Sequence, residues 1–302
     1  MDGILKKIKQ SDAFNRENRV PYLKVIVLMS LFTFVFLGAE FLFVNMISRI
    51  VSGHRSVAAQ NYALGVSAVG FVLYPLLCRF CKGNTQTSVS VCAAVISNAC
   101  LFLMCRSGSY TLTLIAGLLL FLILGVFGSA VFYKSLCLLE DNTHIARLTG
   151  ISYMLGTMLQ IANSNLVHID IAEAAILSVF IMLLALMLIR AEKNSVVPAL
   201  SKSEPDGGNG RESLKISVIL VFFVALMTCI FSTLDNAVTL IHASGEANIG
   251  QWPRVLLALS GLLAGFLFDT ASRKYMSIVM YCITVLSTTC LVVLQFAGSF
   301  TV

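Results

Sequence analysis

The chain has 302 residues, of which 58% are hydrophobic and 12% are charged. Average soluble proteins contain about 25% charged residues, so the composition excludes an ordinary soluble domain. The formal net charge of +6 comes from basic residues that lie between long apolar runs. This pattern is typical of a protein embedded in a lipid bilayer, and it gives no reason to expect a nucleic-acid partner.

Nine apolar runs follow one another along the chain, each close to the length that a helix needs to cross a bilayer. A transmembrane barrel would instead alternate polar and apolar residues. We therefore predict an all-α, polytopic transmembrane helical bundle of nine spans. The expected spans are 24–47, 58–78, 88–105, 111–134, 147–167, 171–190, 216–240, 251–268 and 275–297.

The basic residues predict the orientation of these spans. If the amino terminus is cytoplasmic, all but four of the 21 Lys and Arg residues lie on the cytoplasmic side. The four exceptions are Arg49, Arg55, Arg106 and Arg254. Because such an excess marks cytoplasmic loops, we expect a multi-pass protein of the cell membrane whose carboxyl terminus lies on the outer side.

The longest polar stretch inside the chain divides the spans into six and three. This stretch concentrates Pro, Ser, Gly and charged residues, as linkers do. Shifting the chain by 191 residues aligns Asn45 with Asn236 and Gly70 with Gly261, which suggests an internal repeat. The expected units are a cytoplasmic tail (1–22), a six-helix bundle (23–190), a cytoplasmic linker (191–215) and a partial bundle of three helices (216–302).

The loop after the eighth span carries a short motif. Residues 265–274 read GFLFDTASRK, so that Gly265, Asp269, Arg273 and Lys274 form a Gly-x-x-x-Asp pattern followed by two basic residues. Together with the six-plus-three layout, this motif resembles that of the major facilitator superfamily of transporters. The resemblance implies a secondary transporter that moves a small solute by alternating access.

In the resembled family this loop acts as a latch between the two helical halves. The internal repeat would then place Asp269 at the start of the fifth span. A carboxylate there can accept hydrogen bonds from backbone N–H groups that lack helical partners. Asn142 and Thr143 are alternative caps for the same helix.

Several polar residues lie inside the predicted spans. Glu40 falls in the outer half of the membrane, where an acid usually faces the bundle interior or a watery cavity. It is the main candidate for solute contact or proton coupling, and the alternative is a structural hydrogen bond. Asn45, Asp235, Asn236 and Gln160 either line the same pathway or join helices by hydrogen bonds.

Glycines on the fourth and fifth spans have packing as their default role, because small residues let helices approach closely. These glycines are Gly117, Gly125, Gly128, Gly150 and Gly156. The nine cysteines and four histidines show no ligand spacing for a metal. No pairing of a nucleophile with a base is visible either, so we expect no metal, no cofactor and no enzymatic activity.

The expected partners are a small solute and the lipid bilayer. A facilitator of the resembled family has about twelve helices in two six-helix halves, so we expect the last three to be missing from this chain. Such a chain would need self-association or a partner to cover the exposed helices, and it would not transport alone. The alternative function is a membrane-embedded sensor or ligand-binding module, or a truncated remnant that does not transport.

The orientation can be tested by cysteine labelling in intact cells. An impermeant maleimide added outside should modify Ser107→Cys and Glu246→Cys, because both positions fall in predicted outer loops. Ser203→Cys and Thr270→Cys should be modified only after the cells are permeabilised. The reversed pattern would show that the predicted orientation is wrong.

Overall fold

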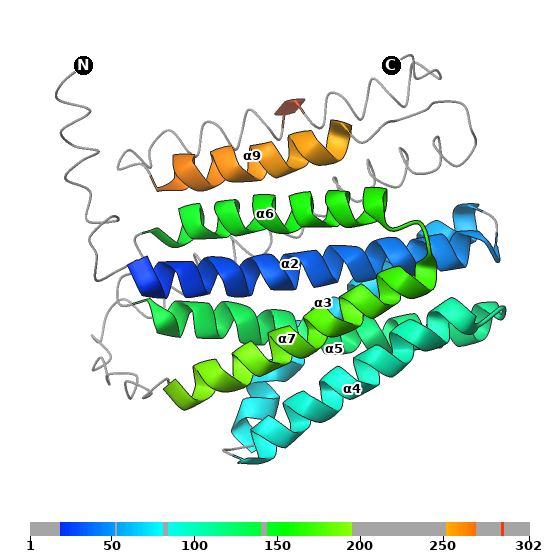
Figure 1. Ribbon diagram of the computed structural model, residues 1–302, viewed down its shortest axis with the longest axis horizontal. Coiled ribbons are helices and arrows are strands. Elements are labelled where there is room, and N and C mark those ends of the chain that lie inside the picture. Colours follow the sequence, from blue (N-terminus) through cyan, green and yellow to red (C-terminus); the bar gives the residue numbers. More distant parts are fainter. Residues whose placement is uncertain are drawn as a thin grey trace.

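The computed structural model is all-helical over the residues that it describes. These residues are 19–51, 53–80, 84–139, 144–194, 252–269 and 285–286, and none of them forms a strand. Figure 1 shows the helices lying side by side. They are α2 (Arg19–Ser48), α3 (Gly53–Phe80), α4 (Asn84–Arg106), α5 (Tyr110–Leu138), α6 (Ile145–Leu166), α7 (Asp170–Asn194) and α9 (Trp252–Phe268).

Five of these helices are long and apolar enough to cross a membrane, namely α2, α3, α4, α5 and α7. The chain is therefore a helical protein suited to several membrane crossings. Helix α6 is not among the five, and three amide side chains, Gln160, Asn163 and Asn165, lie in its second half. Helix α9 has 17 residues. The predicted spans 216–240 and 275–297 lie outside the described residues, apart from residues 285 and 286.

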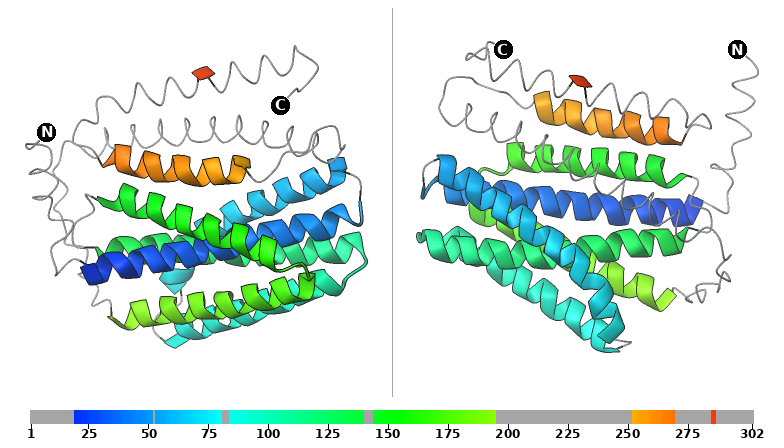
Figure 2. Two further views of the ribbon diagram at one scale, coloured as in Figure 1. Left: turned by 45° about the horizontal axis from the view of Figure 1, so that its top comes forward. Right: turned by 180° about the vertical axis from the view of Figure 1, so that it is seen from behind.

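Helix α2 lies in the middle of the bundle, where it contacts α3, α5, α6 and α7. Helix α6 lies between α2 and α9, as two further views confirm (Figure 2). Successive helices α2 to α7 alternate in direction (Figure 1). We call the end where α2 and α6 begin the proximal end and the opposite end the distal end. By the sequence prediction, the proximal end is cytoplasmic.

Aromatic side chains fill the contact between α2 and α5. The rings of Phe36 and Phe121 lie 5.6 Å apart, and those of Phe43 and Phe121 lie 5.8 Å apart. Both pairs meet edge to face or nearly so, a favourable geometry for aromatic rings. In contrast, large apolar side chains of α3 such as Val72 and Phe80 are exposed, as expected for a surface that faces lipid tails.

Glycines set the closest helix contacts. A Cβ atom at Gly70 of α3 would overlap the Leu122 carbonyl oxygen of α5, and one at Gly125 of α5 would overlap the Ser67 carbonyl oxygen of α3. These two helices therefore touch through their backbones. The packing role predicted for the glycines of the fourth and fifth spans is confirmed, since a Cβ at each would meet a neighbouring helix at Gly117, Gly125, Gly128, Gly150 and Gly156.

Helices α6 and α9 meet in the same way. A Cβ at Gly150 would lie 2.7 Å from the Gly261 carbonyl oxygen, and one at Gly265 would lie 2.7 Å from the Ala146 carbonyl oxygen. Small residues four apart on both helices thus face each other, which is a common basis of helix association in membranes. Gly265, predicted as part of the latch motif, is a packing residue in this contact.

The α3–α5 contact predicts a large difference between two glycines of one helix. Gly70→Ala should lower the free energy of unfolding by about 1–3 kcal/mol, because the added methyl group forces the backbones apart. Gly65→Ala is the matched control, since a Cβ there meets nothing within 4 Å, and helix propensity then favours alanine by about 0.5–1 kcal/mol. Thermal unfolding in detergent measures both. Equal losses of stability would contradict the backbone contact.

Candidate functional site

Glu40 takes part in a hydrogen bond between two helices. Its Oε1 atom accepts a hydrogen bond of 2.8 Å from Gln60 Nε2, which joins α2 to α3. Both residues are half-buried, so the pair lies where the bundle interior meets its surface. The structural hydrogen bond anticipated for Glu40 is therefore present. Its part in a solute or proton pathway stays a prediction.

Gln160 belongs to a different group, which we call the distal polar cluster: Gln160, Asn163 and Glu173. Their exposed fractions are only 5%, 9% and 4%, respectively. Asn163 Nδ2 donates to Glu173 Oε1 over 3.5 Å, and the Glu173 carboxyl group also lies beside Gln160. The two side-chain polar atoms of Gln160 are buried and find no hydrogen-bond partner among the described residues.

The cluster joins α6 to the first turns of α7 and lies against α2. A Cβ at Gly38 of α2 would lie only 2.8 Å from Gln160 Oε1. The absence of a side chain at Gly38 therefore provides the space for the Gln160 amide. Sequence reasoning did not single out Glu173. The available signal was an acid within an otherwise apolar span, a combination that is costly in a membrane and points to function.

An ion pair closes the distal end beside this cluster. Arg49 follows α2, and its guanidinium group holds Asp170 at the start of α7 through two hydrogen bonds of 2.5 and 3.0 Å. The hydrogen bond with Asp170 raises the pKa of Arg49 above its ordinary value. The Arg49 side chain is 60% exposed. An exposed pair of this kind contributes about 1 kcal/mol or less, so its main effect is to fix geometry.

At the proximal end, Asp269 reaches the start of α6. It directly follows α9, and its Oδ2 atom accepts a hydrogen bond of 3.2 Å from the backbone N–H of Arg147. Arg147 Nε lies 3.4 Å and His144 Nδ1 3.8 Å from the same oxygen. The carboxyl side chain is only 2% exposed. The predicted contact of Asp269 with the start of this helix is therefore present.

The residues around Asp269 explain why the contact is specific. The first N–H groups of a helix have no partners within it, and the helix dipole makes this end positive. The Arg147 guanidinium group also lies over the Phe266 ring, 4.9 Å from its centre, in a cation–π contact. One carboxylate thus holds a helix terminus and a cation together. Asn142 and Thr143, the alternative caps, lie outside the described residues.

The remaining predicted site residues are distributed as follows. Asn45 is half-buried on α2, and no contact places it in the distal polar cluster. Asp235, Asn236, Arg273 and Lys274 lie outside the described residues. The structure therefore brings together Asp269 with the start of α6, and Gln160 with Glu173, while Glu40 is hydrogen-bonded to Gln60.

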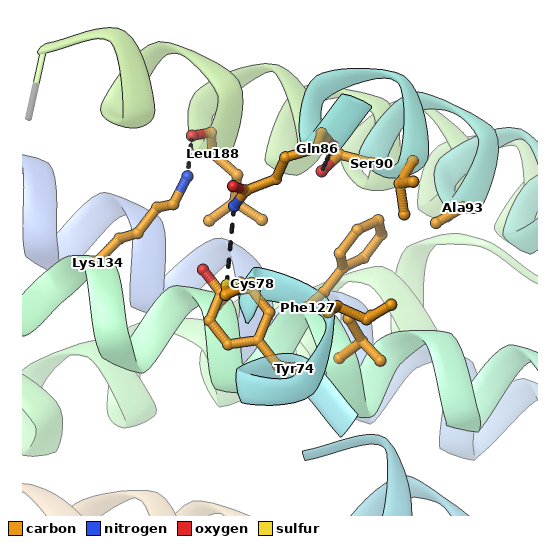
Figure 3. A pocket seen from close by; sticks show the side chains of 12 residues that line it. Tyr74, Cys78, Gln86, Ser90, Ala93, Phe127, Lys134 and Leu188 are labelled. Carbon is orange, nitrogen blue, oxygen red and sulfur yellow. Dashed lines mark hydrogen bonds between the residues drawn. The ribbon is translucent and has the colours of Figure 1, made fainter. Parts of the chain in front are cut away.

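A cavity of about 40 Å³ lies between α3, α4, α5 and α7 at the proximal end (Figure 3). Lys134, which is buried, donates a hydrogen bond of 2.9 Å to the Leu188 carbonyl oxygen at its edge. Gln86 points toward Cys78 across the same space. Since one water needs about 10–15 Å³ by this measure, the cavity has room for a few waters and not for an organic solute.

Neither comparison with known proteins nor a search for metal ligands narrows the class of protein. Comparisons of the chain with protein-family models, with curated proteins and with solved structures found no significant match. Within the described part of the chain, no group of three His, Cys, Asp or Glu residues could hold a metal ion. The five long apolar helices indicate a helical membrane protein, and any narrower assignment depends on its polar contacts.

Two aspartates at opposite ends of the bundle make a matched test. Asp269→Asn should lower the free energy of unfolding by about 1–2 kcal/mol, because it removes a buried charge from a helix start. Asp170→Asn should cost about 1 kcal/mol or less, because its arginine is exposed. Thermal unfolding of both variants checks this order. A larger loss for Asp170→Asn would contradict the capping role of Asp269.

Proposed function

We propose that the chain is a membrane transport protein of the facilitator type, which moves a small solute by alternating access once self-association or a partner covers its exposed helices. The observation that carries the proposal is the contact of Asp269 with the backbone N–H of Arg147. This is the contact expected if the loop after α9 acts as a latch on α6. The latch motif supplies Asp269, and the six-helix bundle supplies the start of α6. Both features that suggested the family therefore take part in this interaction.

The chemistry of the contact suits reversible closure. The carboxylate, the helix start and the Arg147 guanidinium group lie at the proximal end, where water can solvate each of them once they separate. Along the rest of the α6–α9 contact, small residues such as Gly150 and Gly265 present little side-chain surface to disrupt. The aromatic core between α2 and α5 would stay intact, so the halves could rock while each remains folded.

Glu40 and Gln60 supply the polar surface that a solute or a proton would meet. The pair is half-buried and joins two helices of the six-helix bundle. A carboxylate in this setting costs free energy unless it serves a function or is well paired. Proton coupling through Glu40 is therefore part of this proposal. The alternative is a membrane-embedded sensor, which would bind its ligand without opening the two ends in turn.

Reciprocal accessibility distinguishes transport from sensing. Thr149 lies near the proximal end and Asn45 near the distal end, and both side chains are half-buried. A cysteine at either position should therefore react faster when its end of the bundle opens and more slowly when that end closes. Adding Asp269→Asn should weaken the proximal closure. Maleimide modification at position 149 should then become several-fold faster, while modification at position 45 should become slower.

Maleimide also modifies the native cysteines. Their contribution is subtracted by measuring the modification rate of the same protein without the added cysteine. Asp170→Asn is the control for loss of a carboxylate, because its ion pair lies at the distal end and should leave the rate at position 149 unchanged. If Asp269→Asn changes one rate without an opposite change in the other, alternating access is wrong. A local latch in a sensor would then be the better account.

A further inference from the structure

We propose that Glu173 is a proton-binding site inside the bundle, with Gln160 and Asn163 as its hydrogen-bond partners. The site lies at the distal end, where a short turn joins α6 to α7 (Figure 1). All three side chains are more than nine-tenths buried. The inference does not depend on transport, because it follows from the surroundings of one carboxyl group.

The first argument is charge balance. An ionised Glu173 would need a cation, but no ion pair to it is found among the described residues, and Arg49, which lies at the same end of the bundle, holds Asp170 through two hydrogen bonds. Asp170 itself lies three residues before Glu173 on the same helix and opposes a second negative charge there. The other titratable neighbour is Cys105 on α4, whose thiol donates to the Asp170 carbonyl oxygen over 3.7 Å. The groups that α6 presents to Glu173 are neutral amides.

The second argument is the balance of free energies. The amino-terminal end of α7 favours an ionised carboxylate only modestly, even when the group is partly buried. Removing a carboxylate from water costs considerably more, even after the protein relaxes. Asn163 donates to the carboxyl group over a long 3.5 Å, and the Gln160 amide also lies beside it, but neutral amides supply no positive charge to offset the difference. A bound proton removes the charge and with it the penalty.

The third argument comes from Gln160. Its amide oxygen and nitrogen are both buried, and neither makes a hydrogen bond of good geometry in the described part of the chain, although the amide lies beside the Glu173 carboxyl group. An ionised carboxylate only accepts hydrogen bonds, whereas a protonated one has an O–H group to donate. Protonated Glu173 can donate to the Gln160 oxygen, after rotation of the amide if needed, while its other oxygen accepts from Asn163. Protonation thus satisfies a group that is otherwise buried at a cost.

A proton fits this site better than a metal cation. Hard cations such as Ca²⁺ take six or more oxygen ligands, and the cluster offers three side chains. The cavity described above lies at the opposite end of the bundle. Loss of the proton would leave an uncompensated charge between α6 and α7, so the pH at the distal side would control how firmly these helices hold together.

The direct test uses the unmodified full-length chain in lipid vesicles. Dicyclohexylcarbodiimide reacts with protonated carboxyl groups in apolar surroundings, and mass spectrometry locates the modified residue. We expect modification of Glu173, with a yield that falls several-fold as the pH is raised, because a protonated acid loses its proton. Modification of Glu40 without modification of Glu173 would overturn the proposal.

Variants give a second, independent readout. The proton contributes stability that is present at low pH and lost as the pH rises, so the unfolding temperature of the wild type should fall over the same pH range as the modification yield. Glu173→Gln, which mimics the protonated group, should remove this dependence, and Gly65→Ala, at a position where a Cβ meets nothing within 4 Å, should retain it. A dependence on sodium in place of pH, tested by exchanging sodium for choline, would overturn the proton assignment.

Discussion

The start of α6 is the point on which the described structure depends. Asp269 is 122 residues away along the chain, yet its carboxylate supplies the hydrogen bond that the first turn of α6 cannot make for itself. This contact fixes the end of α9 against α6, and glycines then let the two helices approach along their length. Because α6 also packs on α2, the position of α9 is tied to the centre of the bundle.

Helix α6 can be polar because it is enclosed. It carries three amide side chains in its second half and is not among the helices apolar enough to span a bilayer by themselves, but α2 and α9 cover it on two sides. Each end of α6 meets a carboxyl group from another helix or loop, Asp269 at the proximal end and Glu173 at the distal end. One acid is held by a helix start and an arginine, and the other by amides alone. Because their partners differ, we infer different roles for the two acids: Asp269 caps α6, and Glu173 binds the proposed proton.

The sequence predicted the six helices of the first bundle and the α9 segment from apolar length alone, with ends that differ by a few residues. The resemblance of the motif, together with the internal repeat, also predicted the contact of Asp269 with the start of the fifth span. The sequence could not predict Arg147 and His144 as partners, since both look like ordinary loop residues. Gln160 faces Gly38 and Glu173, and the rotation of α6 that sets this direction is not defined by apolar length. Glu173 resembles an ordinary acid in the first turn of a helix.

The central claim is that α9 lies directly against α6 and is held there by Asp269. Spin labels at Leu155→Cys on α6 and Leu259→Cys on α9, both exposed positions, measure this by the distance distribution in lipid vesicles. The account predicts a single short distance, as expected for helix axes about 8–10 Å apart, and a second, longer population in Asp269→Asn. A broad or uniformly long distribution in the wild-type chain would contradict it.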